Sequence, residues 1–150
     1  MPQLRRTSDR TREIASLLHE RFSRLSRQLR HMPLPAGMTQ ERLSALSSII
    51  NDGPISVTAL ADREMVRPAT MSRMVSALVD ERLARRMENK TDGRGVLVAI
   101  TAKGRTAYQR AHKLRLQQLS AALKDLPPDQ LTTMYNLAEA LQRLTKILDE

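Results

Sequence analysis

A polar, glycine-containing turn followed at once by an apolar run is the feature that most constrains how this chain folds. The stretch NKTDGRGVLVAIT, residues 89–101, stands out because most of the chain has helical spacing. Asp-Gly is a strong signal for a hairpin turn, and residues 96–100 have the β-branched character of a strand. The segment LARRMEN, residues 83–89, fits as its partner strand. The sequence therefore predicts one β-hairpin in a helical protein, with Arg94 at its tip between two glycines.

Helical periodicity accounts for the other ordered segments. The stretch MPLPAG, residues 32–37, ends the first helix because prolines block its continuation. Thr39 and Thr101 are suitable N-cap residues, and Pro68 stands at the first helical position, which proline favours. The expected helices cover residues 8–31, 39–50, a short segment after Ser56, 68–82, 101–124 and the segment after Pro127 and Pro128. The expected fold class is mainly α, with a small β-hairpin.

The charge of the chain indicates a polyanionic partner. The 150 residues include 25 Lys and Arg against 16 Asp and Glu, a net charge of +9. Such an excess is typical of proteins that bind nucleic acid, an anionic membrane or an acidic protein. The aromatic residues are only Phe22, Tyr108 and Tyr135, so there is no platform on which unpaired bases can stack. Duplex DNA fits this composition better than a single strand.

Length and composition also limit the protein class. The chain has the length of one domain, and no apolar run reaches the roughly 20 residues that a membrane-spanning helix needs. The arginines near the N-terminus are not followed by the apolar segment of a signal peptide. Without cysteine there is no disulfide framework and no Cys-ligated zinc. We therefore expect a cytoplasmic protein with no membrane partner.

The central segments have the order of a winged helix-turn-helix, in which two short helices precede a hairpin. In such folds the second helix enters the major groove of DNA, and residues 68–82 suit that position. Arg73 could bind a guanine bidentately, a contact worth about 1–3 kcal/mol of discrimination. Asp80 and Glu81 lie at the far end, where phosphates would repel them. The residues expected to face DNA are Ala69, Thr70, Ser72, Arg73 and Ser76, which are small or hydrogen-bonding.

The hairpin supplies a second expected DNA contact. Gly93 and Gly95 leave the loop free of bulky side chains, so Arg94 can reach into a narrow minor groove, whose negative potential attracts arginine. Asp92 would stiffen the loop by pairing with an arginine. We expect Val96, Val98 and Ile100 to anchor the hairpin. Taken alone, each feature also fits an ordinary surface helix and a solvated turn, and the prediction depends on their combination with the charge.

Apolar stripes run along the first and last helices. They are compatible with an intramolecular core or with a dimer interface, and the length of these helices, with little else to cover them, favours the dimer. The expected dimerisation residues are Ile14, Leu18, Phe22, Leu137, Leu141, Leu144 and Leu148.

Residues 68–104, PATMSRMVSALVDERLARRMENKTDGRGVLVAITAKG, resemble the core of the MarR family of bacterial transcriptional regulators. The similarity includes TMSRMV, LVDERLARR, the Asp92-x-Arg94 pair and Gly104 after the apolar strand. It implies one domain over residues 1–150, with a winged helix-turn-helix at about 39–101 and dimerisation helices at about 8–31 and 102–148. It also implies a homodimeric repressor or activator on a palindromic operator, with Arg94 in the minor groove and Asp92 bracing the wing. Many members release DNA when a small anionic or phenolic compound binds between the two regions.

Three positions depart from the family pattern. Arg67 stands where a capping serine is common, a change that removes about 0.5–2 kcal/mol of helix stability, and we expect it to contact a phosphate instead. Met65 and Arg82 stand where glycines are common, which predicts either a left-handed residue or a different helix end. With Arg67 and Lys90 added, the full set of expected DNA-binding residues is Arg67, Ala69, Thr70, Ser72, Arg73, Ser76, Lys90, Asp92, Gly93 and Arg94.

Other functions are less consistent with the residues present. His19, His31 and His112 do not have the spacing of a metal site, and neither a nucleophile elbow nor a glycine-rich phosphate loop occurs. We expect no enzyme activity, no metal and no cofactor. The alternative is a basic helical scaffold that binds an acidic protein or an anionic membrane surface through the arginines of the first helix, Arg21, Arg24, Arg27 and Arg30.

Overall fold

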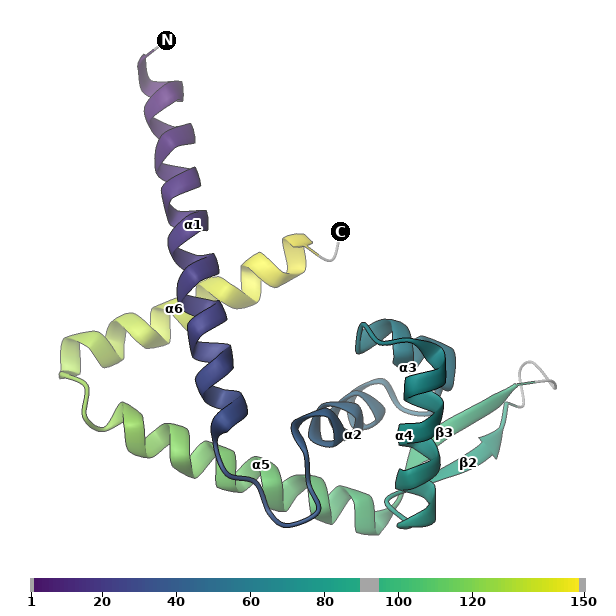
Figure 1. Ribbon diagram of the computed structural model, residues 1–150. Helices are drawn as coiled ribbons and strands as arrows, with labels where there is room; N and C mark the ends of the chain where they lie inside the picture. Colours follow the sequence, from purple (N-terminus) through teal and green to yellow (C-terminus); the bar gives the residue numbers. More distant parts are fainter. Residues whose placement is uncertain (1, 90–94, 149–150) are drawn as a thin grey trace.

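The computed structural model describes the backbone of residues 2–89 and 95–148, and side chains from residue 9 onward. The described elements are six helices and a small three-stranded sheet (Figure 1). In chain order they are α1 (Pro2–His31), α2 (Gln40–Asp52), β1 (Ile55–Ser56), α3 (Val57–Arg63), α4 (Pro68–Asp80), β2 (Ala84–Glu88), β3 (Val96–Ile100), α5 (Ala102–Leu123) and α6 (Pro128–Leu148). The expected class, mainly helical with a β-hairpin, is confirmed.

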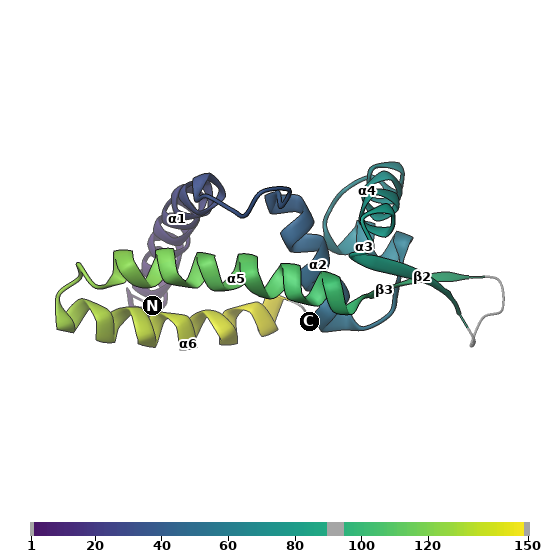
Figure 2. The ribbon, with the colours of Figure 1, turned by 90° about the horizontal axis from the view of Figure 1, so that it is seen from below.

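The hydrophobic core lies among α2, α3, α4 and the sheet. Its largest fully buried side chains come from all four parts: Leu46, Ile49, Leu60, Met71, Val75, Leu78 and Val98. Tyr108 of α5 and Met38, which precedes α2, pack against this cluster. In Figure 2 the elements α2, α3, α4, β2 and β3 gather at one end of the molecule, opposite the turn between α5 and α6.

The sheet contains one strand that the sequence did not indicate. β2 and β3 pair antiparallel from Ala84 opposite Ile100 to Glu88 opposite Val96, as the predicted hairpin requires. β1 adds to the other edge of β3, with Ile55 opposite Val98, giving the order β1-β3-β2. Two residues are too few to show a strand period, so only tertiary pairing reveals β1.

Side chains cap the helices where the sequence suggests. The Thr39 hydroxyl accepts from the amide of Arg42 at 3.3 Å, and the Thr101 hydroxyl accepts from the amide of Gly104 at 2.9 Å. Ser56 caps α3 in the same way, accepting from the amide of Ala59 at 3.1 Å. Each bond satisfies a backbone donor that the first turn of a helix leaves open. The helix starts at 40 and 102 are thereby fixed.

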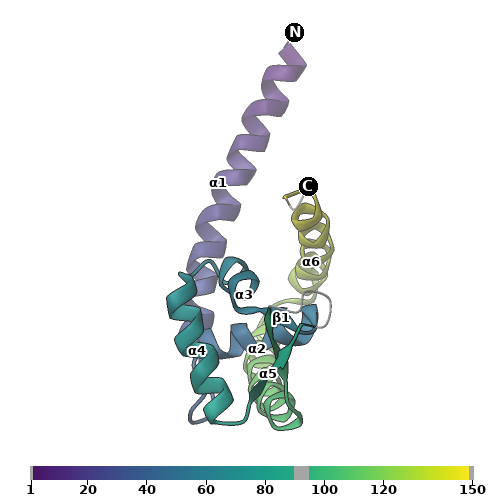
Figure 3. The ribbon, with the colours of Figure 1, turned by 90° about the vertical axis from the view of Figure 1, so that its right-hand side faces the viewer.

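The two terminal helices extend away from the core. α1 projects from the body of the molecule, and α5 and α6 diverge from their connecting turn like the arms of a V (Figures 1 and 3). α6 contains no buried residue. Large apolar side chains stay exposed on both helices, including Ile14 at 48% and Leu148 at 75%.

Helices α3 and α4 both end in a Schellman motif without glycine. After α3, the amide of Met65 donates to Asp62 and that of Val66 to Ala61; after α4, the amide of Arg82 donates to Val79 and that of Leu83 to Leu78. This pattern needs a left-handed residue at the helix end, and it is Met65 at φ 52° and Arg82 at φ 61°. The left-handed alternative for these positions is confirmed.

Replacing Met65 with glycine should stabilise the protein. The left-handed conformation costs an L-residue about 1–2 kcal/mol, and glycine avoids this at an entropic cost of about 0.5–1 kcal/mol. Because Met65 is 92% exposed, little packing is lost. We expect Met65→Gly to raise the free energy of unfolding by about 0.5–1 kcal/mol in urea titrations at fixed protein concentration. Met65→Ala is the matched control and should give no gain; an equal gain would show that removing the side chain, not relieving the backbone, is responsible.

Gly104 should tolerate no side chain. A Cβ there would lie 1.9 Å from the carbonyl oxygen of Leu83, which is backbone and cannot turn aside. Gly104→Ala would stabilise an unhindered helix by about 0.5–1 kcal/mol; here we expect a loss of at least about 2 kcal/mol, in the range of overpacked sites. Thermal unfolding measures it. Arg105→Ala, at an exposed position of the same turn, is the control and should change the melting temperature little.

Candidate DNA-binding surface

Helix α4 divides sharply into a buried face and an exposed face. Met71, Val75 and Leu78 are at most 1% exposed and fix the helix on the core. Ala69, Thr70, Ser72 and Arg73 are exposed on its other side, toward the N-terminal end. In Figure 3 α4 lies at the edge of the molecule, where no other helix covers its outer side. Four of the side chains expected to face DNA are therefore available to a ligand at one surface.

The N-terminal end of α4 has no side-chain cap. Arg67 occupies the N-cap position in an extended conformation, φ −65° and ψ 140°, and its side chain makes no capping hydrogen bond. Its carbonyl accepts from the amides of Thr70 and Met71 at 2.9 and 3.1 Å. The uncapped helix end carries a partial positive charge, and the exposed Arg67 adds a full one. Such an end is suited to a phosphate, which supports the phosphate contact expected for Arg67.

Ser76 differs from the other expected base-reading residues. It is half-buried, and its hydroxyl accepts a hydrogen bond from Nη2 of Arg86 at 2.9 Å. Arg86 lies on β2, so this bond joins the DNA-reading helix to the wing. Arg86 was not among the residues predicted from the sequence. The alternation in LARRMEN could have indicated it, because Arg86 lies on the same face of the strand as Ala84, which is buried.

The described part of the wing ends where the amide of Asn89 donates to the carbonyl of Gly95 at 2.9 Å. Lys90, Asp92, Gly93 and Arg94 lie outside the described residues, so their expected roles stay predictions. One expectation for the strand is wrong: Val96 is 51% exposed and does not anchor the hairpin. The other two expected anchors are confirmed: Val98 is buried and Ile100 packs against the core. At Val98 β3 has β1 on one edge and β2 on the other, whereas Val96 is paired with β2 alone.

The acidic end of α4 is held by basic side chains. Nη1 and Nη2 of Arg42 both donate to the carboxylate of Glu81, Nη1 at 3.1 Å, and Nζ of Lys103 donates to the carbonyl of Glu81 at 2.8 Å. The hydrogen bond from Arg42 holds the pKa of Glu81 below its usual value, with smaller charge effects from Arg42 and Lys103. One carboxylate near the DNA-reading helix is thus neutralised and turned toward α2.

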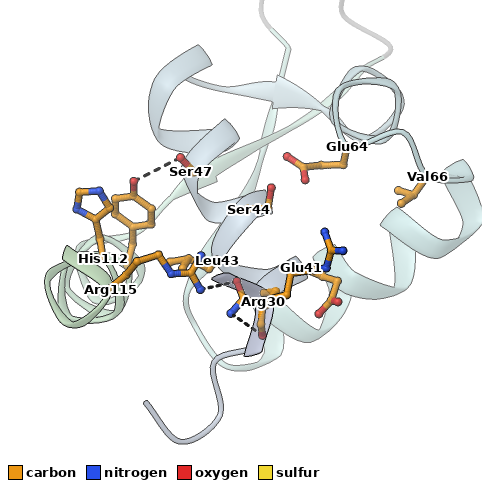
Figure 4. Close-up of a pocket in the computed structure, with 11 residues that line it drawn as sticks. Arg30, Glu41, Leu43, Ser44, Ser47, Glu64, Val66, His112 and Arg115 are labelled. Atoms are coloured by element: carbon orange, nitrogen blue, oxygen red, sulfur yellow. Dashed lines mark hydrogen bonds between the residues drawn. The ribbon is translucent and has the colours of Figure 1, made fainter. Parts of the chain in front are cut away.

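A pocket of about 670 Å³ lies beneath the helix-turn-helix, between the end of α1, α2 and α5 (Figure 4). Tyr108 and His112 of α5 stack at 5.5 Å on one wall. Arg115 donates to Oε1 of Gln40 at 2.6 Å, while its Nε is buried without an acceptor among the described residues. Glu64, at the end of α3, lines the pocket too. The family resemblance implies a ligand site between the two regions, but its residues could not be named from the sequence because the pocket walls come from four separate segments.

Among the described side chains, no group of three or more His, Asp or Glu residues could hold a metal ion. No helix in the described part of the chain is both long and apolar enough to cross a bilayer.

Comparison with known proteins identifies the family. The MarR family model matches residues 38–96. An HTH-type transcriptional regulator of Mycobacterium leprae is 33% identical over 136 residues, covering 91% of this chain and 95% of that protein. The multiple antibiotic resistance protein MarR of Escherichia coli is 30% identical over 138 residues, covering 89% of this chain and 96% of the other.

A solved structure supports the same assignment. A mutant of Escherichia coli MarR in complex with operator DNA superimposes with a TM-score of 0.61 at 28% identity, covering 86% of this chain and 93% of that one. The winged-helix fold, the family match and the identity over nearly the full length agree. The chain belongs to the MarR family and is a DNA-binding transcriptional regulator.

Proposed function

We propose that this protein is a homodimeric cytoplasmic repressor, which binds a palindromic operator and leaves it when a small anionic or phenolic ligand binds. The observation that carries the proposal is the outer face of α4, where Ala69, Thr70, Ser72 and Arg73 are exposed over a rigidly buried inner face. Small side chains let the helix backbone approach base edges, and Arg73 supplies a bidentate donor for guanine. One domain carries both functions: residues 39–101 read DNA, and residues 8–31 and 102–148 hold the dimer.

The exposed apolar stripes of α1 and α6 support the dimer. Leu137, Leu141, Leu144 and Leu148 fall within about 60° of one another on a helix of 3.6 residues per turn. In the single chain Leu141 is only partly covered, and Leu144 and Leu148 are 39% and 75% exposed. Ile14 and Phe22 of α1 are exposed at 48% and 36%. A monomer would keep this surface in water, whereas a second copy would bury it.

A twofold symmetric protein favours a twofold symmetric site. Two copies of α4 would enter major grooves about one helical turn apart, and the two wings would reach the neighbouring minor grooves. Arg94, Lys90, Gly93 and the bracing Asp92 are the proposed wing contacts. All four stand in the sequence between β2 and β3, which supports assigning them to the wing.

The pocket between α1, α2 and α5 is the proposed ligand site. Arg30 and Arg115 provide positive charge, and the stacked Tyr108 and His112 provide a flat wall for an aromatic ring. The unsatisfied Nε of Arg115 would gain an acceptor from a carboxylate or phenolate. Glu64 lines this pocket and lies at the end of α3, in the turn before α4. Its carboxylate accepts a hydrogen bond from the hydroxyl of Ser48 on α2 at 2.6 Å. A ligand that displaced this bond would move the start of the reading helix.

The scaffold alternative has less support. Residues spaced by three drift about 60° around a helix at each step, so Arg21, Arg24, Arg27 and Arg30 spread over half its circumference. Arg21 is paired with Glu20 at 3.1 Å, and Arg30 lines the pocket. The four arginines therefore form no single basic face of the kind a flat anionic surface needs.

Duplex selection tests the DNA-binding proposal. From a random pool the protein should enrich one palindromic sequence, with half-sites about one helical turn apart. Arg73→Ala should weaken binding to that duplex and relax the preference at one base pair, a discrimination of about 1–3 kcal/mol. Arg110→Ala on α5 is the charge-matched control and should keep the preference. Enrichment of no symmetric sequence by the unmodified protein would refute the proposal.

Sedimentation tests the dimer. Leu144→Glu places a charge in the stripe of α6 that the second copy would bury, and burying an unpaired charge is strongly unfavourable. We expect the variant to sediment as a monomer at concentrations where the unmodified protein is dimeric. Gln142→Glu adds the same charge at an exposed position outside the stripe and should leave the dimer intact. Equal effects of both variants would place the interface elsewhere.

A further inference from the structure

Arg86 lies where the DNA-reading helix meets the wing. Alternate residues of a strand share a face, so Arg86 is on the same side of β2 as Ala84, which is 2% exposed and belongs to the core beside α4. From that side Nη2 of Arg86 donates to the hydroxyl of Ser76 on α4 at 2.9 Å. The guanidinium is therefore held in the angle between α4 and the strand that leads to the wing tip.

The charge of Arg86 is not neutralised by any described carboxylate. Within residues 9–89 and 95–148 the ion pairs are Arg21 with Glu20, Arg42 with Glu81 and Arg63 with Asp52. Arg86 is exposed, and the bond to Ser76 uses only one of the five N–H donors of a guanidinium. The other donors have no hydrogen-bond partner among the described residues. Among the described arginines of α4 and β2, Arg86 is the one whose side chain is hydrogen-bonded to another side chain.

On a bound duplex, one sugar–phosphate strand would lie at the angle between α4 and β2. A protein that places a helix in the major groove and a wing in the adjacent minor groove must cross the sugar–phosphate strand that separates them. We propose that Arg86, fixed by Ser76, binds a phosphate of this intervening strand and sets the angle between helix and wing. The inference rests on the proposed function, because it requires both elements to lie on the same duplex.

The inference changes the role of Ser76. The sequence places Ser76 among residues that face base edges, but its hydroxyl is engaged by Arg86. Ser76 is then a positioning residue, which acts on DNA through the arginine. A planar guanidinium held at one end loses less conformational freedom when it binds a phosphate than a free one does. Arg86 should for this reason contribute more affinity than a mobile surface arginine.

The experiment measures binding to the selected duplex as a function of salt. The variants are Arg86→Ala, Arg86→Lys, Ser76→Ala and the double variant Arg86→Ala with Ser76→Ala. Arg85→Ala is the matched control, because Arg85 is the adjacent exposed arginine and lies on the opposite face of β2. Thermal unfolding of each variant shows whether the fold is kept.

Arg86→Ala should weaken binding about tenfold and lower the slope of log K against log salt by about 0.9 for each chain bound, the value for one lost phosphate contact. Arg86→Lys should keep the slope, since the charge remains, and lose a few-fold in affinity. Ser76→Ala should also keep the slope, with a few-fold loss that vanishes in the Arg86→Ala background. Arg85→Ala should change the slope less than Arg86→Ala does.

If the variants still bind the duplex, an unchanged slope in Arg86→Ala would overturn the phosphate contact. An equal change of slope in Arg85→Ala would overturn it too. A full effect of Ser76→Ala in the absence of Arg86 would overturn the positioning role and restore Ser76 as a base contact. Failure of the unmodified protein to bind any duplex would instead refute the proposed function. If Arg86→Ala unfolds, Arg86→Gln replaces it, because glutamine removes the charge but keeps a donor for Ser76; an unchanged slope in Arg86→Gln would overturn the phosphate contact.

Discussion

One junction of hydrogen bonds connects α4, the β2–β3 hairpin and α5. The hydroxyl of Thr101 donates to the carbonyl of Arg82 at 2.7 Å and accepts from the amide of Gly104 at 2.9 Å, while the amide of Thr101 donates to the carbonyl of Leu83 at 3.1 Å. The end of α4, the end of β3 and the start of α5 thus share one set of hydrogen bonds. Gly104 permits this approach because any Cβ would collide with the carbonyl of Leu83. A displacement of α5 would therefore alter the hydrogen bonds at the end of α4. This coupling is the physical route by which a ligand bound beside α5 would release DNA under the proposed function.

Two residues with strained backbone conformations, one before α4 and one after it, lower the stability of the fold. Met65 and Arg82 hold left-handed conformations that glycine would adopt without strain. Each completes a Schellman motif, and each motif leads the chain into or out of α4. The sharp turns are therefore maintained by the surrounding packing, with Leu60 and Leu78 fully buried one turn before each strained residue. Because the strain is local and the Met65 side chain is almost fully exposed, the stability of the turn can be changed without changing the reading face.

Elements with strong local signals could be predicted from the sequence. Thr39, Pro68 and Thr101 determine where helices begin through interactions with neighbouring residues, and the Asp-Gly pair in the sequence predicts the hairpin that β2 and β3 form. The strand β1, the exposure of Val96 and the partner of Ser76 depend on which segments meet in space. Ser76 and Arg86 are ten residues apart on different elements, and no spacing rule connects a helix position with a position on the following strand. The lining of the pocket with Arg30 and Arg115 could not be assembled from the sequence for the same reason.

The arginines of this chain differ in whether a carboxylate neutralises them. This difference determines where the positive field lies, which the net charge of +9 alone does not. Arg42 and Arg63 are paired with carboxylates, so they contribute structure and little external field. Arg42 in particular neutralises Glu81 at the end of α4 that should lie away from DNA. Arg67 and Arg73 at the other end, and Arg86 at the wing, have no carboxylate partner within the described residues. An anion approaching the molecule therefore meets uncompensated positive charge at the N-terminal half of α4 and at its junction with β2. On the proposed function, this asymmetry would orient a duplex before any base is contacted, because long-range attraction acts on the phosphate backbone first.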